Sequence, residues 1–309
     1  MRTLPLIGAG GAAPTQNRAH HHSDFGVAEL TAAKAGRTVS VCIPARNEAA
    51  TVGLIVDCVR RELCERHALV DEIVVIDDHS IDATAQTAAR AGARVVDASA
   101  VLAEYGDGHG KGEVLWKSVF ASVGDLIIWC DADITEFSPR FVTGIAGPLL
   151  TDPAIHFAKG FYHRPEADGL GGGRVTELVA RPLLSMFFPH LCSIRQPLSG
   201  EYGGRREVLE RVPFVQGYGV DVGLLIDVAA QVGVDAIAQV DLDVRHHRNR
   251  PLSELSPQAM AVSETILRKA RPDLIQPNTT LRRPDGSEIA VDVRERPPLI
   301  EIASYAGMA

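Results

Sequence analysis

The sequence lacks several features that would assign it to a particular class of protein. Among its 309 residues no apolar run approaches the roughly 18 residues of a membrane-spanning helix. The N-terminal residues do not show the basic, then apolar, then small-residue pattern of a signal peptide. The five cysteines are an odd number and form no Cys-x-x-Cys pair, so they do not indicate a disulfide framework. We therefore expect a cytoplasmic protein without a membrane span.

Negative charge exceeds positive charge, with 39 Asp and Glu residues against 31 Lys and Arg. The formal net charge is −8 at pH 7, which argues against nucleic acid as the main partner. With 46% apolar and 23% charged residues, the composition is that of a globular protein. The length fits one large domain, or one domain plus an extension. An acidic protein can still bind anions where basic side chains and helix N-termini gather locally.

An acidic pair is the most informative feature that is present. Asp131 and Asp133 flank Ala132 and directly follow the apolar run 126–130. Two carboxylates this close repel each other and lose solvation at the end of a buried strand, unless positive charge neutralises them. Mg²⁺ or Mn²⁺ would do so and could in turn hold a diphosphate. Alone the pair is weak evidence, because acidic residues also cap helices and turns.

Apolar strands and helical segments alternate through the first half of the chain. Strands are predicted over 39–43, 72–76, 93–96 and 126–130, and helices over 48–66, 82–91 and 112–122. This alternation predicts an α/β fold with parallel strands, whose ligands bind at the carboxyl edge of the sheet. The polar segments 44–48 and 77–84 lie at that edge. Each of them could equally serve only as a helix cap.

Other segments stand outside this pattern. Residues 1–27 show no periodicity, and we predict a flexible tail whose His20–His22 run is solvated rather than metal-binding. Later, Gly171–Gly173 precede a helical segment that runs from Arg174 to Leu184. Glycines there let backbone N–H groups converge on an anion, with the positive end of a helix behind them. A plain flexible loop before the helix is the alternative.

Together these motifs resemble a known family. P-A-R-N-E after the first strand, D-D-H-S-x-D-A-T after the second and D-A-D after a later one resemble the nucleotide-sugar half of GT-A glycosyltransferases. The segments G-G-G-R-V-T-E-L-V-A-R-P-L-L and R-H-H-R-N-R-P are similar to those of the glucosyl-3-phosphoglycerate synthases of actinobacteria, and the similarity runs over about 27–255. The resemblance implies a GT-A fold, a Rossmann-like, mostly parallel sheet flanked by helices, with a smaller C-terminal extension.

The resemblance also implies a division of the chain and a reaction. The tail (1–27) would precede a catalytic domain (28–240), with its donor site in 38–135 and its acceptor region in 160–225. An extension (241–309) would add metal and donor residues and a dimer contact. The reaction would be metal-dependent, anomer-retaining transfer of glucose from UDP-glucose to the 2-hydroxyl of 3-phosphoglycerate, with Mg²⁺ or Mn²⁺ as cofactor. A mannosyl, ADP-glucose or GDP-glucose donor, a polyprenyl phosphate acceptor, or a binding protein without activity are the alternatives.

Site residues follow from the same resemblance, position by position. The implied donor-binding residues are Pro44, Ala45, Arg46, Glu48, Asp78, Lys111, Asp131 and Ala132; the metal ligands are Asp133 and His247; the acceptor-binding residues are Gly172, Gly173, Arg174, Thr176 and Asn249; and the residues around the reacting sugar are Tyr218, Asp221 and Arg250. Three of these depart from the family pattern. Arg46 replaces a smaller apolar residue, Ala132 replaces a serine, and Asp221 is shorter than the expected glutamate, so the sugar donor stays open.

Overall fold

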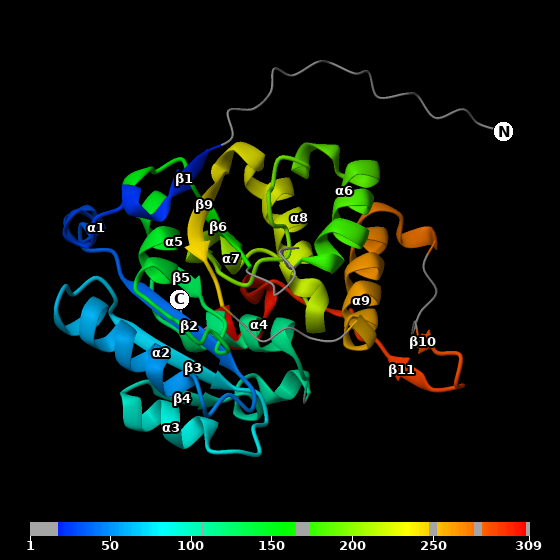
Figure 1. The fold of residues 1–309 in the computed structure, drawn as a ribbon, viewed down its shortest axis with the longest axis horizontal. Coiled ribbons are helices and arrows are strands. Elements are labelled where there is room, and N and C mark those ends of the chain that lie inside the picture. Colours follow the sequence, from blue (N-terminus) through cyan, green and yellow to red (C-terminus); the bar gives the residue numbers. More distant parts are fainter. Residues whose placement is uncertain (1–17, 107, 165–172, 247–251, 275–279, 307–309) are drawn as a thin grey trace.

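The computed structural model describes residues 18–106, 108–164, 173–246, 252–274 and 280–306 (Figure 1). At its centre lies an eight-stranded sheet with the strand order β1-β9-β6-β7-β5-β2-β3-β4. Only β7 runs antiparallel to its neighbours β5 and β6, and the other pairs are parallel. The prediction of a mostly parallel α/β sheet is confirmed. The strands are β1 (Ala19–His21), β2 (Val39–Ala45), β3 (Glu72–Asp77), β4 (Arg94–Asp97), β5 (Leu126–Trp129), β6 (Phe157–His163), β7 (Tyr202–Arg205) and β9 (Ile237–Val244).

The inner strands are apolar on both faces because helices cover both sides of the sheet. In β5, Leu126 and Ile128 join the apolar cluster on one face. Ile127 and Trp129, which alternate with them, join the cluster on the other face. This is the period-2 alternation of a strand buried between two layers.

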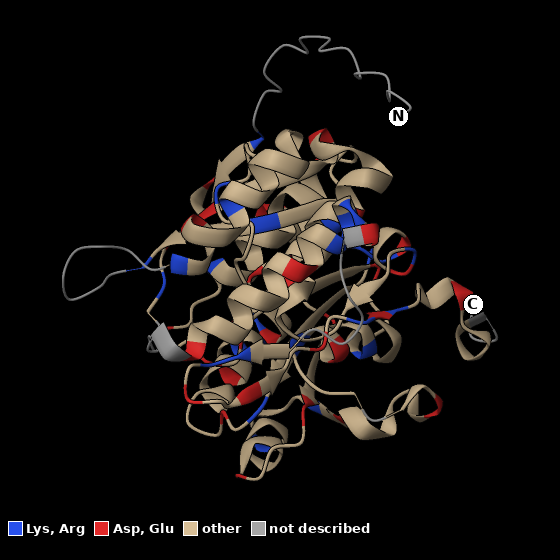
Figure 2. Ribbon diagram, turned by 90° about the vertical axis from the view of Figure 1, so that its right-hand side faces the viewer, with Lys and Arg blue, Asp and Glu red and all other residues tan. Residues whose placement is uncertain are grey.

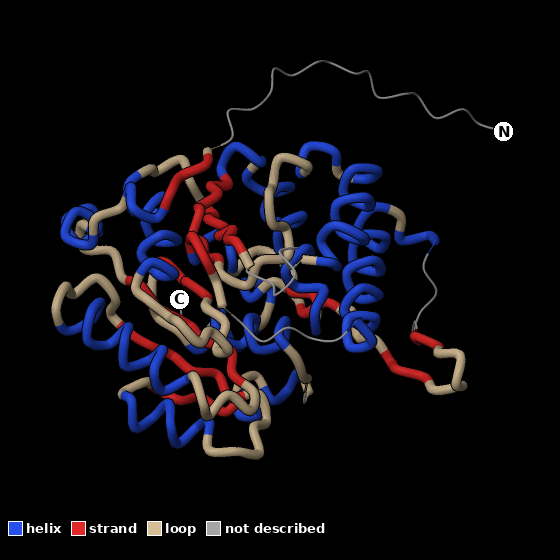
Figure 3. The backbone as a smooth tube through the Cα atoms, viewed as in Figure 1, coloured by secondary structure: helices blue, strands red, loops and turns tan. Residues whose placement is uncertain are grey.

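Two layers of helices enclose the sheet (Figure 3). The first layer packs on the cluster that contains Leu126 and consists of α1 (Val27–Lys34), α2 (Val52–Val59), α3 (Thr84–Ala91) and α5 (Arg140–Thr151). The second packs on the cluster that contains Trp129 and consists of α4 (Lys111–Ala121), α6 (Arg181–Phe187), α8 (Val220–Val232) and α9 (Leu252–Ala270). Six-residue and five-residue π-helical turns, Arg60–Glu65 and Thr176–Ala180, extend α2 and precede α6. The short helices α7 (Arg206–Leu209) and α10 (Ala303–Ala306) complete the set.

The predicted N-terminal tail is wrong for its last residues. Ala19–His21 form β1, which pairs in parallel with β9 at the edge of the sheet, and a 3-10 turn follows over His22–Asp24. The strand is held by backbone pairing with an existing edge rather than by an apolar pattern of its own, so periodicity gave no signal. Residues 1–17 lie outside the described part of the chain.

The C-terminal extension does not begin at residue 241. That boundary falls inside β9, which crosses it from Ile237 to Val244. After α9, an antiparallel hairpin of β10 (Thr280–Arg282) and β11 (Glu288–Ala290) precedes β12 (Glu295–Arg296), which returns to pair with β8 (Phe214–Val215). Leu299 and Ile302 are buried in the same cluster as Trp129. Residues 295–302 therefore pack onto the body that contains the large sheet.

Charges of both signs are interspersed over the elements in Figure 2, in keeping with a modest net charge. Within the described ranges, none of the helices combines the length and the apolar character that a bilayer crossing requires.

Candidate active site

A cavity of about 510 Å³ opens at the carboxyl edge of β2, β3 and β5. It brings together every residue predicted to bind the donor, from segments more than 80 positions apart in the chain. Its lining comprises Pro44, Ala45, Arg46, Glu48, Asp78, Lys111, Asp131 and Ala132, together with the predicted Asp133, Tyr218 and Asp221. Parallel strands end at one edge, which is why motifs so far apart in sequence meet here.

Asp78 lies at the end of this cavity nearest to β3. Its side chain is almost completely buried, and its Oδ2 accepts a hydrogen bond of 3.1 Å from the N–H of Gly110. The guanidinium of Arg46 lies 3.7 Å from the same oxygen, and the ring of His79 contacts Oδ1 at 3.0 Å. A carboxylate fixed in this way can accept hydrogen bonds from a base or a ribose.

The acidic pair lies at the centre of the cavity and is bridged by an arginine. One nitrogen of Arg245, Nη2, is 2.9 Å from both Asp131 Oδ2 and Asp133 Oδ1. The Nε of Arg245 lies 3.2 Å from Glu201 Oε1, and Lys111 Nζ lies 3.0 Å from Asp131 Oδ1. The repulsion expected between the two aspartates is therefore offset in part by cations of the chain itself.

The pKa values of the pair move apart. Burial alone would raise the pKa of Asp131, but Lys111 and Arg245 outweigh it and hold that pKa well below the usual range. Burial and the charge of Asp131 raise the pKa of Asp133, despite the contribution of Arg245. Asp133 is also the more exposed of the two, with 39% of its side chain accessible against 24% for Asp131. Asp133 thus carries a carboxylate that further positive charge would stabilise, which fits a divalent cation with oxygen ligands.

Lys111 connects the acidic pair to Asp221. Its Nζ lies 3.3 Å from Asp221 Oδ1, and the same oxygen accepts a hydrogen bond of 2.8 Å from the hydroxyl of Tyr202. Burial opposes the charge of Lys111, but Asp131 and Asp221 raise its pKa well above the usual value, so it is a permanent ammonium group in this cavity. A fixed cation here can neutralise a phosphate of a bound nucleotide.

Gly200 permits the close approach of two segments at the site. A Cβ atom on Gly200 would come within 2.0 Å of Asp131 Oδ2, so any side chain would displace the acidic pair. Gly200 and Glu201 directly precede β7, which pairs with β5, and this antiparallel insertion carries Glu201 and Tyr202 to the carboxylates that follow β5. The second half of the chain thereby contributes to a site begun by the first.

A second, smaller cavity of about 100 Å³ adjoins the first. Arg164 and Leu198 line both cavities. The smaller one also contains Gly173 and Thr176 of the predicted acceptor site, and Arg195 from the loop before Gln196. Gly173 has a φ of +105°, a conformation that favours glycine, immediately before the helical turn that carries Thr176. Convergent arginines beside a helix start suit a phosphate or a carboxylate.

Four predicted site residues lie outside the described part of the chain: Gly172, His247, Asn249 and Arg250. Arg174 is described, at the start of the helical segment that follows Gly173. His246, the neighbour of His247, is exposed, and its Nε2 lies 3.7 Å from Glu136 Oε2.

Sequence reasoning assigned no role to several residues that complete the site. Arg245, Glu201 and Tyr202 are buried, Arg164 is half-buried and Arg195 is exposed. Arg245 lies within the quoted segment R-H-H-R-N-R-P. Burial of a charged residue is a signal for Arg245 and Glu201. It could have been read only for Arg245, which follows an apolar strand directly, as Asp131 does.

The fold and the site together define a nucleotide-sugar-dependent glycosyltransferase of the GT-A type. A family model described as glycosyl transferase family 2 matches residues 40–206. Over 283 residues the chain is 47% identical to the glucosyl-3-phosphoglycerate synthase of Mycolicibacterium smegmatis, covering 88% of this chain and 92% of that protein. The same enzyme of Petrotoga mobilis is 43% identical over 93% of this chain and 95% of its own.

Solved structures agree with these relatives. The Mycobacterium tuberculosis glucosyl-3-phosphoglycerate synthase, solved with Mn²⁺, UDP-glucose and phosphoglyceric acid, superposes with a TM-score of 0.84 at 43% identity, covering 92% of this chain and 98% of that one. Mannosyl-3-phosphoglycerate synthase from Rubrobacter xylanophilus gives a TM-score of 0.85 at 39% identity, over 92% and 97%. The chain belongs to the glucosyl-3-phosphoglycerate synthase family within glycosyl transferase family 2.

Proposed function

We propose that this protein transfers glucose from UDP-glucose to the 2-hydroxyl of 3-phosphoglycerate, with retention of the anomeric configuration. The observation that carries the proposal is the adjacency of the two cavities. A nucleotide-sized cavity lined by the acidic pair shares Arg164 and Leu198 with a small cavity whose charged lining residues are Arg164, Arg195 and Glu177. A bound sugar nucleotide and a small phosphorylated acid would meet at that shared wall. The Mycobacterium tuberculosis relative was solved with both of these ligands and Mn²⁺.

The donor would lie in the larger cavity. Asp78 and Glu48 would face the nucleoside, with Pro44, Ala45 and Arg46 along the strand end. Lys111 would contact the diphosphate, and Asp131 and Ala132 the ribose region. Asp133 and His247 would hold Mg²⁺ or Mn²⁺, which when bound neutralises charge on the departing diphosphate. Imidazole and carboxylate together suit either ion, Mn²⁺ more than Mg²⁺.

The acceptor would lie in the smaller cavity. Its phosphate would bind at the helix start formed by Gly172, Gly173, Arg174 and Thr176, with Asn249 beside it. Arg164 and Arg195 extend the positive surface of this cavity. Because the whole protein is acidic, a substrate with a phosphate and a carboxylate depends on this local concentration of arginines.

Asp221 would position the sugar together with Tyr218 and Arg250. Its Oδ1 already accepts a hydrogen bond from Tyr202 and pairs with Lys111, which lowers its reactivity as a nucleophile. Retention would then arise when the departing phosphate accepts the acceptor's proton on the same face of the sugar. Asp221→Asn tests this role: a positioning residue leaves measurable turnover, whereas a nucleophile leaves none above the level of Asp221→Gly.

The overall reaction is tested by release of UDP. Purified protein with Mg²⁺ should release UDP from UDP-glucose only when 3-phosphoglycerate is present, and glycerate should be a poor substitute. Release of UDP at the same rate with water or with a polyprenyl phosphate would contradict the proposal. A mannosyl donor is the second candidate, because the mannosyl-3-phosphoglycerate synthase noted above is 39% identical. A matrix of UDP-, ADP- and GDP-sugars against both acceptors distinguishes the donors.

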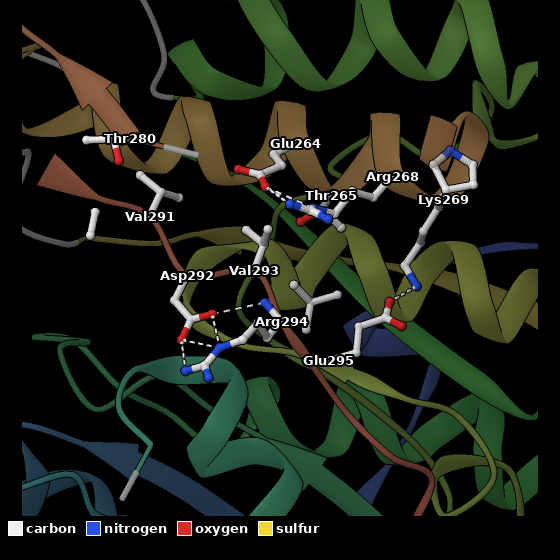
Figure 4. A pocket seen from close by; sticks show the side chains of 13 residues that line it. Glu264, Thr265, Arg268, Lys269, Thr280, Val291, Asp292, Val293, Arg294 and Glu295 are labelled. Atoms are coloured by element: carbon white, nitrogen blue, oxygen red, sulfur yellow. Dashed lines mark hydrogen bonds and ion pairs between the residues drawn. The ribbon is translucent and has the colours of Figure 1, made fainter. Parts of the chain in front are cut away.

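We also propose that the enzyme is a cytoplasmic homodimer whose contact involves the C-terminal hairpin. The hairpin of β10 and β11 projects from the body beside α9 (Figure 1), and an isolated hairpin is marginally stable in water. Between the hairpin, α9 and the segment 291–294 that leads to β12 lies a cavity of about 760 Å³ (Figure 4). Val215, Val291 and Val293 give it an apolar part, and the pairs Arg268–Glu264 and Lys269–Glu295 line its rim. A second copy of this chain would cover it.

Light scattering coupled to size-exclusion chromatography tests the dimer. The wild type should have twice the mass of one chain, and Val291→Asp should elute as a folded monomer. Val123→Asp is the matched control, because Val123 is 73% exposed elsewhere on the body and its replacement should leave the dimer intact. A wild-type monomer, or a dimer that Val291→Asp leaves unchanged, would contradict this contact.

A further inference from the structure

We propose that His21, His22 and Asp243 form a second metal site, which binds a divalent transition ion such as Zn²⁺ and ties β1 to the end of β9. The site is separate from the acidic centre of the donor cavity and lies where the blue N-terminal strand meets β9 in Figure 1. One ligand atom from each residue lies within 4.8 Å of the others. The sequence-based prediction that the histidine run is merely solvated is thereby revised for His21 and His22.

The three side chains converge on one point. His21 Nε2 lies 3.0 Å from Asp243 Oδ1, and His22 Nε2 lies 2.5 Å from Asp243 Oδ2. The two rings face each other with their centroids 4.4 Å apart. An ion about 2.0–2.2 Å from each ligand would hold the three ligand atoms about 3.3 Å apart. The present spacing therefore needs only small side-chain rotations to admit an ion.

The backbone places Asp243 in this position by means of a bulge. Between Phe161 and His163 of β6 there is one residue, but Asp241 and Val244, their partners on β9, are separated by two. Asp243 has a φ of +61°, in the left-handed region that costs most side chains free energy. Arg140 fixes the bulge by donating hydrogen bonds of 2.9 and 2.7 Å to the carbonyls of Leu242 and Val244. Bulges redirect side chains, and this one directs a carboxylate to the two imidazoles.

The ligand set selects the class of metal. Two imidazoles with one carboxylate favour Zn²⁺ and similar transition ions over Mg²⁺ and Ca²⁺, which prefer oxygen. His21 Nδ1 accepts a hydrogen bond of 3.3 Å from the N–H of Ser23 and lies 2.7 Å from Ser23 Oγ. Binding of an ion at Nε2 would place the ring proton on Nδ1, where the Ser23 hydroxyl can accept a hydrogen bond from it.

Solvent can reach the site and complete the coordination. The side chains of His21, His22 and Asp243 are 41%, 20% and 50% accessible. His20, the third member of the run, packs instead against Phe25, with ring centroids 5.3 Å apart. Successive residues of a strand point to opposite faces, so His20 is a natural control of the same residue type on the same strand.

Binding of an ion would restrain the end of β9. β9 ends at Val244, and the next residue is Arg245, which contacts both aspartates of the donor site. An ion that joins β1 to the bulge would fix the end of the strand from which Arg245 extends. We therefore expect Zn²⁺ to raise the melting temperature of the protein without being required for the donor site itself.

The experiment measures Zn²⁺ bound per chain by equilibrium dialysis, using full-length protein without an added histidine tag and an excess of Mg²⁺. The wild type should retain one Zn²⁺ with its melting temperature raised. His22→Gln and Asp243→Asn should each weaken that affinity by at least about tenfold and abolish the thermal shift. His20→Gln should behave as the wild type, and so should Asp133→Asn, which alters the acidic centre of the donor cavity.

Three outcomes would overturn the proposal. The first is the absence of bound Zn²⁺ in the wild type when Mg²⁺ is in excess. The second is equal affinity in the wild type and in both His22→Gln and Asp243→Asn. The third is loss of the ion in Asp133→Asn with retention in Asp243→Asn, which would place it in the donor cavity. Substitution of Co²⁺ gives an independent readout, because its visible spectrum should report nitrogen ligands in the wild type and lose that signature in His22→Gln.

Discussion

At the scale of single residues, the donor site depends on a balance of charge around Asp133. The carboxylates of Asp131, Asp133, Glu201 and Asp221 face two paired cations, Lys111 and Arg245. Arg245 is shared among three of these acids and Lys111 between two, so these ion pairs offset only part of the charge of the cluster. This residual negative charge is the physical reason for assigning a divalent ion to Asp133 rather than treating the pair as a helix cap.

Replacing Asp133 tests that assignment. Asp133→Asn keeps the size of the side chain and removes its charge, so turnover should fall by about 10²–10³-fold in the UDP-release assay. Excess EDTA should have the same effect on the wild type. Asp285→Asn, in an exposed turn, is the control and should leave turnover unchanged. Full turnover in EDTA would refute the role of the metal. Normal turnover in His247→Ala with loss in His246→Ala would show that the neighbouring histidine is the ligand.

Replacing Arg174 tests the acceptor site. Arg174→Ala should raise the KM for 3-phosphoglycerate about 10-fold or more, because a charge-assisted hydrogen bond to phosphate is lost. The affinity for UDP-glucose should stay nearly constant, and the variant should discriminate less between 3-phosphoglycerate and glycerate. Arg66→Ala, which removes an exposed arginine paired with Glu62, is the matched control. Loss of donor affinity with unchanged preference for the phosphorylated acceptor would assign this loop to the donor site.

The residues of the site could be predicted only where a motif carries them. Asp78, Asp131 and Asp133 follow apolar strands, and topology alone brings them to one edge. Arg164 and Arg195 belong to no motif, and their position depends on packing of the second half of the chain. A position set by tertiary packing leaves no period or spacing in the sequence.

At the scale of elements, β12 attaches the C-terminal segment to α4 through a buried ion pair. Arg296 donates hydrogen bonds of 2.6 and 3.0 Å to the carboxylate of Glu113, which is fully buried. Burial would raise the pKa of Glu113, but its hydrogen bonds from Arg296 and Gln216 outweigh that effect and lower the pKa. The indole of Trp116 adds a hydrogen bond of 2.8 Å to the carbonyl of Pro297.

Removal of the Arg296 side chain should therefore lower the stability of the folded protein. Arg296→Ala leaves Glu113 buried without its main partner and should lower the free energy of unfolding by about 3–5 kcal/mol, measured in urea. Arg282→Ala is the matched control, because Arg282 pairs with Glu288 on the exposed hairpin and should contribute less than about 1 kcal/mol. Equal effects of the two substitutions would show that β12 does not hold the segment in place.

Lys159 on β6 makes stability depend on pH. Burial lowers its pKa from 10.5 to about 8, although its ammonium group donates a hydrogen bond to the carbonyl of Ser199. Between these two pH values the unfolded chain holds a proton that the folded protein has released. Stability therefore rises as pH increases from about 8 to about 10.5, by up to about 1.4 kcal/mol per pH unit.

Urea unfolding of the wild type and of Lys159→Met at pH 7.5, 8.5 and 9.5 measures this effect. The free energy of unfolding of the wild type, relative to that of the variant, should increase as pH rises. Lys34→Met, which removes a lysine of α1, is the control. Its free energy of unfolding should depend on pH as that of the wild type does. If the free energy of unfolding depends on pH in the same way in Lys159→Met and in the wild type, the pKa of Lys159 is the same in the folded and unfolded states.

The elements themselves were largely predictable from hydrophobic periodicity. The predicted strand over 72–76 corresponds to β3, and the predicted helix over 112–122 corresponds to α4. The N-terminal strand β1 and the strand β12 could not be predicted, because each is only two or three residues long and is held by pairing with a strand elsewhere. Short strands of this kind contain too few residues to establish a period.

At the scale of the whole molecule, both ends of the described chain return to the catalytic body. β1 pairs with β9 at one edge of the sheet, and β12 pairs with β8 near α4. The predicted boundaries at residues 27 and 241 therefore do not coincide with the ends of these paired strands. Pairing between strands far apart in the sequence joins these segments to the body. A division based on composition cannot detect such pairing.

The bridge that Arg245 makes between Asp131 and Asp133 has a further consequence for regulation. Because the protein supplies its own cations to the acidic cluster, the stability of the fold around the donor cavity should not depend on Mg²⁺. Scarcity of Mg²⁺ in the cell would then lower the rate of the enzyme without shortening its lifetime. Supply of the ion would restore the existing pool of enzyme at once, with no need for new synthesis.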